Sequence, residues 1–328
     1  MRDQYERTIE YLRLSVTDRC NLRCRYCMAE AGVAWKSPEE ILSYEELERL
    51  VRLMVTRLGI SHVRLTGGEP LVRQGIVDFA RRLRAVPGLR DLSLSTNGLL
   101  LAEMAGKLRQ AGVDRVNISL DTLRPERFRE IARREGLPRV LAGVEAALKA
   151  GLEPVKLNCV ALGGYNEDEV VDFARLTLDR PLHVRFIELM PLGTEYQWEA
   201  WRFVPAEALR RRIEAAFGPL APGEVRGAGP ARYLRIPGAV GTLGFITAMS
   251  QHFCADCNRV RLTADGYLNP CLGSMLATDL RAPLRAGAGD GEILRLLTEA
   301  ISLKPERHQM EDLTRPENRQ RRMSGIGG

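Results

Sequence analysis

The 328-residue chain contains no uninterrupted apolar run of about eighteen residues, so the sequence predicts no membrane span. The first residues, Met1 to Gln4, are polar and include no apolar signal core, so we expect a cytoplasmic protein and not a secreted one. No G-x4-G-K-[ST] loop occurs, so any phosphate group must be bound by side chains. No stripe of basic and aromatic residues is present, and we therefore expect no nucleic-acid surface.

Cysteine is also sparse: seven residues in a chain of this length do not make a disulfide scaffold. Six of the seven fall into two tight groups, which indicates metal binding in a reducing compartment. The composition is 45% hydrophobic and 27% charged, as is usual for a globular protein, and the length predicts one large α/β domain with an appendage. The net charge of +6 suits an anionic ligand such as a nucleotide.

The first cysteine group consists of Cys20, Cys24 and Cys27, spaced C-x3-C-x2-C, with Tyr26 directly before the last cysteine. Three thiolates this close in sequence can bind one metal centre. A structural zinc site uses four ligands and a fully ligated four-iron cluster uses four cysteines, so three cysteines leave one iron open to a small molecule. The alternative is a zinc knuckle whose fourth ligand lies elsewhere.

Strand and helix patterns alternate over the first 190 residues. The predicted strands are 10–16, 62–66, 91–95, 115–120, 154–160 and 182–187. A predicted helix begins at Ser43, where Glu46 completes a capping box, and another begins at Asn166, where Glu169 plays the same part, and runs to about residue 178. Other helices are predicted near 75–85, 101–111 and up to residue 150. Six strands alternating with helices predict a parallel sheet, curved into a partial barrel.

The unusual sequences of this region all follow a predicted strand. They are the cysteine group, Gly67-Gly68-Glu69-Pro70, Ser95-Thr96-Asn97-Gly98, Ser119-Leu120-Asp121 and Glu188-Leu189-Met190. In barrels of this kind the chemistry lies where strands end and helices begin. We therefore expect these segments to meet in one site.

After Pro191 the pattern changes, so we predict two domains, 1–195 as the partial barrel and 196–328 as an α+β region that closes it. The second domain holds Trp198 and Trp201 in a connecting segment, a helix at 205–217, a strand at 233–236 and a late amphipathic helix. Its polar tail, 305–328, ends in Gly327-Gly328.

The second cysteine group is Cys254, Cys257 and Cys271, again three thiolates without a fourth ligand. A Cys3His zinc site completed by His252 is the alternative to a cluster. The segment 258–268 alternates as a strand, turns at Asp265-Gly266 and returns, which places Arg259 and Arg261 on one face beside the metal. Paired guanidinium groups suit phosphate oxygens, and the alternative is a solvated basic strand face.

The first cysteine loop and Gly67-Gly68-Glu69-Pro70 together resemble the two signatures of the radical S-adenosylmethionine (SAM) superfamily. The resemblance implies a partial (βα)6 barrel in which an open iron of a [4Fe-4S] cluster chelates SAM, and an electron cleaves SAM to a 5′-deoxyadenosyl radical. It assigns SAM binding to Tyr26, Gly68, Glu69, Ser119 and Met190. From the residues alone, Tyr26 and Met190 are equally suited to a core, and Gly67-Gly68 to a helix-capping turn.

Further motifs resemble one family, the GTP 3′,8-cyclases that begin molybdenum cofactor biosynthesis. They are the segments 12–18, 64–70, 185–190 and 253–261, and the Gly-Gly terminus. The resemblance implies that a second [4Fe-4S] cluster, held by Cys254, Cys257 and Cys271, binds guanine. The radical then removes hydrogen from the ribose C3′, and the carbon radical closes onto guanine C8 to give (8S)-3′,8-cyclo-7,8-dihydroguanosine 5′-triphosphate.

The same resemblance assigns the contacts with GTP. They are Arg13, Arg64, Ser95, Lys156, Arg259, Val260 and Arg261, with Arg13 and Arg185 as candidates for a catalytic role beside the cluster and SAM. From the residues alone, Lys156 is equally a snorkelling surface lysine. Many relatives carry threonine in place of Ser95, which keeps the hydroxyl, and the unpaired Cys159 is interpreted as a small core residue.

The family also implies partners and a role for the tail. The product passes to cyclic pyranopterin monophosphate synthase, the electron comes from a donor such as flavodoxin or ferredoxin, and a homodimer is expected. Gly327 and Gly328 are expected to reach the active site, and their deletion to abolish cyclisation with both clusters intact.

Two other functions are weighed against this one. A radical SAM peptide maturase with an auxiliary cluster usually has more cysteines near its C-terminus, and a peptide substrate gives no reason for Arg259 and Arg261. A non-catalytic, zinc-stabilised nucleotide- or RNA-binding protein leaves the glycine motif and both missing fourth ligands unexplained. Metal analysis separates the two possibilities. A radical enzyme with two clusters holds about eight irons per chain, whereas a zinc-stabilised binding protein holds one or two zinc ions.

Overall fold

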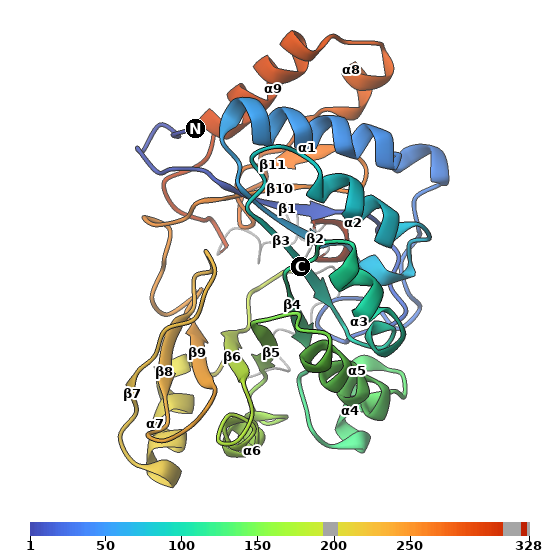
Figure 1. Ribbon diagram of the computed structural model, residues 1–328. Coiled ribbons are helices and arrows are strands. Elements are labelled where there is room, and N and C mark those ends of the chain that lie inside the picture. The colour runs from blue at the N-terminus through green and yellow to red at the C-terminus, as the bar shows by residue number, and fades with distance from the viewer. Residues whose placement is uncertain (193–202, 311–322, 327–328) are drawn as a thin grey trace.

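The computed structural model describes residues 1–192, 203–310 and 323–326 (Figure 1). Trp198, Trp201, Gly327 and Gly328 lie outside the described residues, as does the predicted domain boundary between residues 195 and 196. The expectations about these positions stay predictions. None of the described helices is long and apolar enough to cross a lipid bilayer.

Six parallel strands alternate with helices along the first part of the chain, as predicted. The strands are β1 (Tyr11–Ser15), β2 (His62–Thr66), β3 (Asp91–Thr96), β4 (Arg115–Ser119), β5 (Val155–Ala161) and β6 (Leu182–Glu188). The helices between them are α1 (Tyr44–Leu58), α2 (Ile76–Arg84), α3 (Leu101–Gln110), α4 (Pro125–Ala132), α5 (Leu137–Lys149) and α6 (Val170–Arg175). Short 3-10 turns occur at η1 (Pro38–Glu40), η2 (Pro70–Val72) and η3 (Glu167–Glu169).

Helix α1 begins and ends where its sequence predicts. The Ser43 hydroxyl accepts from the Glu46 N–H at 3.2 Å, and the Glu46 carboxylate accepts from the Ser43 N–H at 2.7 Å, so the capping box is confirmed. Gly59 ends the helix in the left-handed conformation, with φ of 77°.

The predicted cap of the sixth helix is wrong. The Asn166 side chain makes no cap hydrogen bond, because its amide instead donates to the carbonyls of Asp121 and Val160, both at 2.8 Å. A 3-10 turn, η3, takes the place of the first helical turn, and α6 ends at Arg175, before the predicted residue 178.

The C-terminal region adds strands to both edges of the same sheet. The order is β12-β11-β10-β1-β2-β3-β4-β5-β6-β9-β8-β7. Strand β10 pairs with β1 in parallel, and β9 pairs with β6 in parallel. These pairs cover edges of the barrel that would otherwise expose unpaired backbone groups. The appendage is therefore continuous with the barrel sheet.

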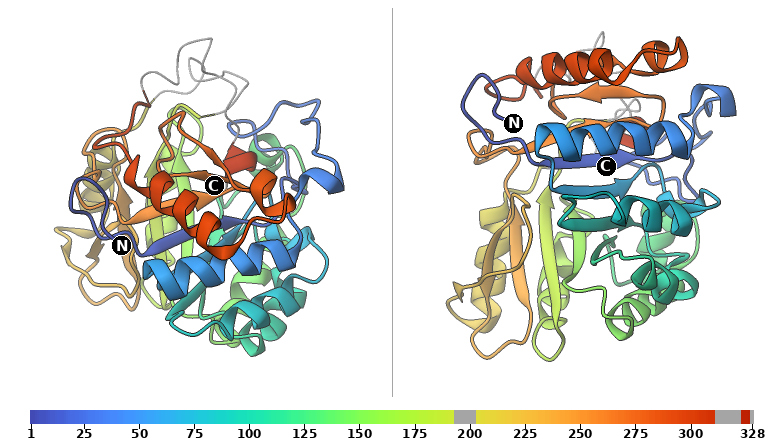
Figure 2. Two further views of the ribbon diagram at one scale, coloured as in Figure 1. Left: turned by 90° about the horizontal axis from the view of Figure 1, so that it is seen from above. Right: turned by 45° about the horizontal axis from the view of Figure 1, so that its top comes forward.

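The added elements complete the outline of the molecule. The strands are β7 (Ala221–Pro222), β8 (Arg232–Arg235), β9 (Thr242–Ile246), β10 (Arg259–Leu262), β11 (Tyr267–Asn269) and β12 (Thr278–Asp279). The helices are α7 (Ala206–Phe217), α8 (Arg281–Arg285), α9 (Asp290–Ser302) and α10 (Met323–Ile326). Helix α9 lies beside α1 at the top of the view, as both views of Figure 2 also show.

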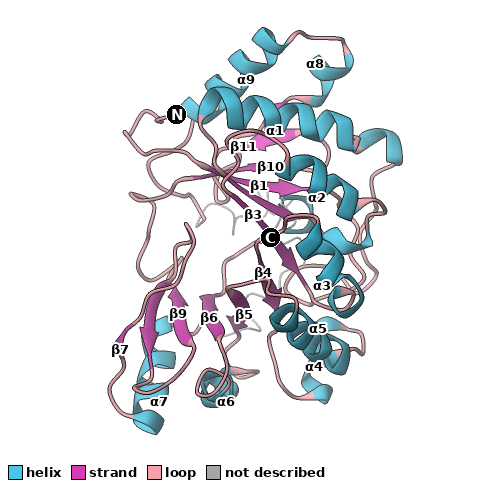
Figure 3. Ribbon diagram, viewed as in Figure 1, coloured by secondary structure: helices cyan, strands magenta, loops and turns pink. Residues whose placement is uncertain are grey.

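The sheet curves, with most of its helices on the outer side (Figure 3). Strand residues that face these helices, such as Val116 and Ile118, are fully buried in the hydrophobic core. The alternate residues face the barrel interior and are mostly polar or charged. Because side chains alternate across a strand, a polar inner face that carries no apolar packing is suited to hold a ligand.

Candidate functional site

A cavity of about 240 Å³ lies at the carboxyl ends of the strands. It is lined by Cys20, Cys24 and Cys27, by the five residues predicted to bind SAM (Tyr26, Gly68, Glu69, Ser119 and Met190), and by Arg13, Ser95, Asn97 and Arg261. The structure therefore brings all predicted members of the first site together.

The three cysteines of this cavity fit an iron–sulfur cluster. All three are thiols and not disulfides, and all are only partly exposed. Burial, with the nearby Cys27 and Asp121, raises the pKa of the Cys24 thiol well above its ordinary value, and burial also raises that of Cys20. Such thiols ionise only beside a strong cationic centre, which a cluster supplies.

The two glycines of the second motif are required by the chain's own backbone. A Cβ on Gly67 would lie 2.6 Å from the Thr17 carbonyl oxygen, and one on Gly68 would lie 2.4 Å from that of Arg19. The Gly68 and Glu69 N–H groups donate to these same carbonyls, each at 2.8 Å. The motif thus holds the start of the cysteine loop in place, a role that sequence reasoning missed.

Glu69 joins the ends of β2 and β3. Its carboxylate accepts from the Thr96 hydroxyl at 2.8 Å, the Asn97 N–H at 2.6 Å and the Leu71 N–H at 3.0 Å. Burial raises the pKa of this carboxyl to about 7 despite these bonds. Three internal donors leave limited room for a ligand ammonium group, so a SAM contact by Glu69 stays a prediction.

Replacing Gly68 with alanine is expected to lower the free energy of unfolding by about 1–3 kcal/mol, because the new methyl group overlaps the Arg19 carbonyl. Gly106→Ala is the matched control, since no heavy atom lies within 4 Å of its added Cβ and it is in helix α3; we expect it to stabilise by about 0.5–1 kcal/mol. Urea unfolding of both variants measures the difference. Equal effects of the same sign would contradict the packing role of Gly68.

The Tyr26 hydroxyl is fixed by the loop after β4. It donates to the Asp121 carboxylate at 2.7 Å, and the other Asp121 oxygen accepts from the Val160 N–H at 2.9 Å. Burial raises the pKa of Asp121 to about 6. Tyr26 therefore presents its ring to the cavity in one fixed position.

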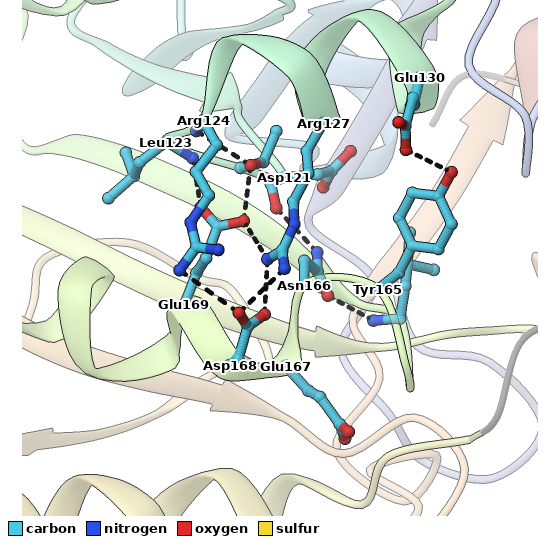
Figure 4. A network of polar contacts seen from close by, with 12 residues as sticks. Asp121, Leu123, Arg124, Arg127, Glu130, Tyr165, Asn166, Glu167, Asp168 and Glu169 are labelled. Carbon is cyan, nitrogen blue, oxygen red and sulfur yellow. Dashed lines mark hydrogen bonds and ion pairs between the residues drawn. The ribbon is translucent and has the colours of Figure 1, made fainter.

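A polar network braces this loop from outside the cavity (Figure 4). The buried Glu169 accepts from the Thr122 hydroxyl and the Leu123 N–H, both at 2.7 Å, and forms an ion pair with Arg127 at 2.8 Å. Asn166 adds its bond to the Asp121 carbonyl. The sequence contained the signal, Asn166 followed by Glu169, but we interpreted it as a helix cap.

A second cavity, of about 140 Å³, holds the other cysteine group. Its lining includes Cys254, Cys257 and Cys271 with Tyr11, Arg13, Arg64, Arg185, Arg259, Arg261 and Lys304. Arg13, Asn158, Met190 and Arg261 also line the first cavity, so the two cavities adjoin. The Val260 side chain is buried in the core, so only its backbone is available to a ligand.

Lysine 304 organises the second cysteine group, and sequence reasoning missed it. Its ammonium group donates to the carbonyls of Arg259 at 2.8 Å and Pro270 at 2.7 Å. Arg259 lies two residues after Cys257, and Pro270 directly precedes Cys271. Burial opposes ionisation of Cys257, but Arg259 and Lys304 outweigh it and lower the pKa of this thiol to about 7. A thiolate-binding cluster suits this environment.

His252, the fourth ligand in the alternative of a Cys3His zinc site, is not among the residues that line the second cavity. The His252 ring faces His308 at 2.8 Å and the Ala248 carbonyl at 3.1 Å. Over residues 1–192, 203–310 and 323–326, no three His, Cys, Asp or Glu side chains are grouped closely enough to hold a single metal ion; this applies to both cysteine groups alike and does not separate zinc from a cluster.

Lys156 is buried on the inner face of β5, so it is not a snorkelling surface lysine. It lines neither cavity and donates to the Arg226 carbonyl at 2.8 Å. Burial, with the charges of Arg185, Arg115 and Arg64, lowers the pKa of its ammonium group to about 6. Cys159 is buried in the core, as interpreted.

The barrel interior carries a concentration of cations. They are the arginines Arg13, Arg64, Arg115, Arg185, Arg259 and Arg261, and Lys156 lies among them as a further basic side chain, mostly neutral above about pH 6. Burial, followed by repulsion from Arg259, lowers the pKa of Arg261 to about 10, and burial lowers that of Arg64 to about 10 as well. Repulsion among buried cations is relieved by a bound polyanion.

The parallel barrel and the loop of three cysteines after its first strand define a radical SAM protein. Residues 14–177 match the family model described as the Radical SAM superfamily, and residues 182–310 match the one described as Molybdenum Cofactor Synthesis C. The fold is similar to that of SuiB from Streptococcus suis, crystallised with S-adenosylmethionine, with a TM-score of 0.57, 13% identity, 84% of this chain and 64% of that chain covered. At this identity the likeness concerns the fold alone.

Full-length relatives identify the family. The chain is 55% identical to the protein named GTP 3′,8-cyclase from Pelotomaculum thermopropionicum and 53% identical to that from Heliobacterium modesticaldum, with 100% of each chain covered. It is 51% identical to the protein of the same name from Moorella thermoacetica, again over 100% of both chains. The chain belongs to the GTP 3′,8-cyclase family.

Proposed function

We propose that this protein converts GTP to (8S)-3′,8-cyclo-7,8-dihydroguanosine 5′-triphosphate, the first step of molybdenum cofactor biosynthesis. The observation that supports it most is the joining of the two cysteine cavities through Arg13 and Arg261, inside a barrel crowded with cations. A nucleoside triphosphate held there would lie across the junction of the two cavities. A peptide substrate gives no reason for such a charge.

In the first cavity, Cys20, Cys24 and Cys27 would hold a [4Fe-4S] cluster, and Tyr26, Gly68, Ser119 and Met190 would contact SAM. A bound cluster would supply the electron for reductive cleavage of SAM, and the cleaved SAM would supply the radical chemistry at the C3′ position of GTP. The chain's own task is to orient SAM and to keep water away, and the enclosure by Leu189 and Leu192, both buried, serves this.

In the second cavity, Cys254, Cys257 and Cys271 would hold a second [4Fe-4S] cluster, beside which the guanine of GTP would bind. Arg259, the backbone of Val260, and Arg261 would contact the base and ribose, and Arg64, which lines the second cavity, and Lys156, which lies outside both cavities, would contact the phosphates. Arg13 lines both cavities and Arg185 lines the second. Their positive charges would stabilise the bound nucleotide. Ser95 lines the first cavity and would contact GTP from there.

The remaining assignments complete the proposal. Residues 1–195 act as the radical SAM domain and 196–328 as the substrate and auxiliary-cluster domain. The product passes to cyclic pyranopterin monophosphate synthase, a flavodoxin or ferredoxin donates the electron, and the protein acts in the cytoplasm as a homodimer.

The decisive experiment is anaerobic reconstitution with iron and sulfide, followed by incubation with SAM, GTP and a strong reductant. Mass spectrometry is expected to find 5′-deoxyadenosine and an isomer of GTP of equal mass. Deoxyadenosine without consumption of GTP would overturn the substrate assignment. Uptake of zinc with intact SAM would overturn both cluster assignments.

Binding of GTP at pH 8 is expected to take up roughly one proton through Lys156. In the free protein its pKa is about 6, so the amine is mostly neutral at pH 8, and an adjacent phosphate raises the pKa and favours the ammonium form. The uptake falls away below about pH 6, where the group is already charged. Calorimetry in buffers of different ionisation enthalpy measures it.

Two lysine variants make that measurement specific. Lys156→Met is expected to lose the proton uptake, whereas Lys107→Met, at an exposed position of helix α3, keeps it. Uptake that persists in Lys156→Met would show that another group titrates and would remove Lys156 from the phosphate contacts.

A further inference from the structure

We propose that Asn117 and Arg115, on strand β4, form with Lys156 a subsite for the distal phosphates of the nucleotide. The proposal rests on the proposed function, because it assigns part of the GTP site. Neither residue of β4 was among the predicted contacts.

Asn117 is the strongest sign of a ligand in the barrel. The residue is 0% exposed, yet neither its amide nitrogen nor its amide oxygen has a hydrogen-bond partner among the residues that the structure describes. Buried side-chain amides almost always find partners, so an orphaned one indicates a group that binds there. Its neighbours Val116 and Ile118 face the outer core, so Asn117 faces the interior.

Arg115 presents a second unpaired group on the same face. Its Nε and Nη2 atoms donate to the two oxygens of Asp91 at 2.8 and 2.7 Å, which fixes the plane of the guanidinium. Its Nη1 atom is buried and makes no hydrogen bond within the described part of the chain, and the nearby Tyr11 hydroxyl is also buried without one. The ion pair with Asp91 thus orients a donor without using it.

Lys156 completes the subsite. Strand register places Asn117 directly beside Lys156 on β5 and Ser95 on β3. Lys156 is also crowded by Arg64, Arg115 and Arg185. The unused N–H donors of Asn117 and Arg115 together with the positive charge around them select an anion with several oxygens, such as phosphate, while the Asn117 oxygen is left to accept from another donor.

The segment 226–230 closes this end of the barrel. The Arg226 carbonyl accepts from Lys156, and a Cβ on Gly227 would lie 3.2 Å from the Lys156 Nζ and 3.3 Å from the Arg115 Cζ. Gly229 and Pro230 line the second cavity. The segment therefore lies between this cavity, where guanine would bind, and the basic side chains of Lys156 and Arg115. A side chain at Gly227 would crowd the Lys156 ammonium and the Arg115 guanidinium groups, and its φ of 130° also favours glycine.

The test compares nucleotides that differ only in their phosphates. Asn117→Leu, with both clusters reconstituted anaerobically, is expected to bind GTP about tenfold or more weakly, because a hydrogen bond to a charged group is lost. Its affinity for GMP is expected to change less than about twofold. Thr177→Val, in the turn between α6 and β6, alters an equally buried polar residue and is expected to change neither affinity.

A second variant, Asn117→Asp, is expected to raise the melting temperature while it weakens GTP binding. Asn117→Asp places a carboxylate beside Lys156 and Arg115, so the melting temperature of the free protein is expected to rise, while GTP binding falls further than in Asn117→Leu. Equal losses for GMP and GTP, or unchanged GTP binding in both variants, would overturn the subsite. Failure of the unmodified protein to bind GTP at all would instead overturn the proposed function.

Discussion

Replacing Cys24 with alanine is expected to abolish formation of 5′-deoxyadenosine and to lower the iron content from about eight to about four per chain, because two thiols cannot retain the first cluster. Cys257→Ala is expected to lose the other four irons and the conversion of GTP, but to keep reductive cleavage of SAM. The two cysteines line different cavities, so the losses are separable. Iron and sulfide analysis, electron paramagnetic resonance and product chromatography measure each of them.

Cys159→Ala is the control for both variants. Cys159 lies in the hydrophobic core. Its replacement is expected to leave the iron content and both reactions unchanged. An eight-iron Cys24→Ala protein, or loss of SAM cleavage in Cys257→Ala, would show that the cysteines are not divided between two clusters in this way.

Replacing Asp91 with alanine is expected to lower the free energy of unfolding by about 3–5 kcal/mol, because it leaves Arg115 buried without its partner. The loss is aggravated by the neighbouring Arg64 and by Lys156 in its charged form, on both of which the Asp91 charge also acts favourably. Denaturant unfolding measures the change. GTP is expected to stabilise this variant more than the unmodified protein, since its phosphates supply the missing negative charge.

Glu6→Ala removes a comparable ion pair at the surface. Its bond to Arg2 is 2.8 Å long, but both side chains are largely exposed, so the expected loss is below about 1 kcal/mol. Equal losses in Asp91→Ala and Glu6→Ala would contradict the claim that burial makes the Arg115 pair indispensable.

Much of the barrel was predictable because its signals are local. Ser43, Glu46 and Gly59 predict the ends of α1 through bonds within one or two turns, and the structure agrees. The cysteine loop and the Gly67-Gly68 turn belong to motifs whose spacing alone indicates a shared site, and they do line one cavity.

The parts that sequence reasoning missed depend on contacts between distant segments. No local pattern tells that β10 pairs with β1, or that Asn166 turns back to the Asp121 carbonyl. Arg115 and Asn117 did leave a signal: a parallel strand covered on both faces should be apolar on both, yet β4 alternates polar and apolar residues. That contradiction identifies a strand with one face lining a polar chamber.

The edge pairing of the sheet has a consequence for biosynthesis. Strand β1 leaves the ribosome early, but its partner β10 begins at Arg259, 248 residues after Tyr11. At about 5–20 residues per second, β1 waits roughly 12–50 seconds for that partner. During this interval a nascent chain carries an open strand edge that can pair with a neighbouring polypeptide. Slow translation or high expression therefore favours aggregation of this enzyme, and holding chaperones protect it most while its last third is still being made.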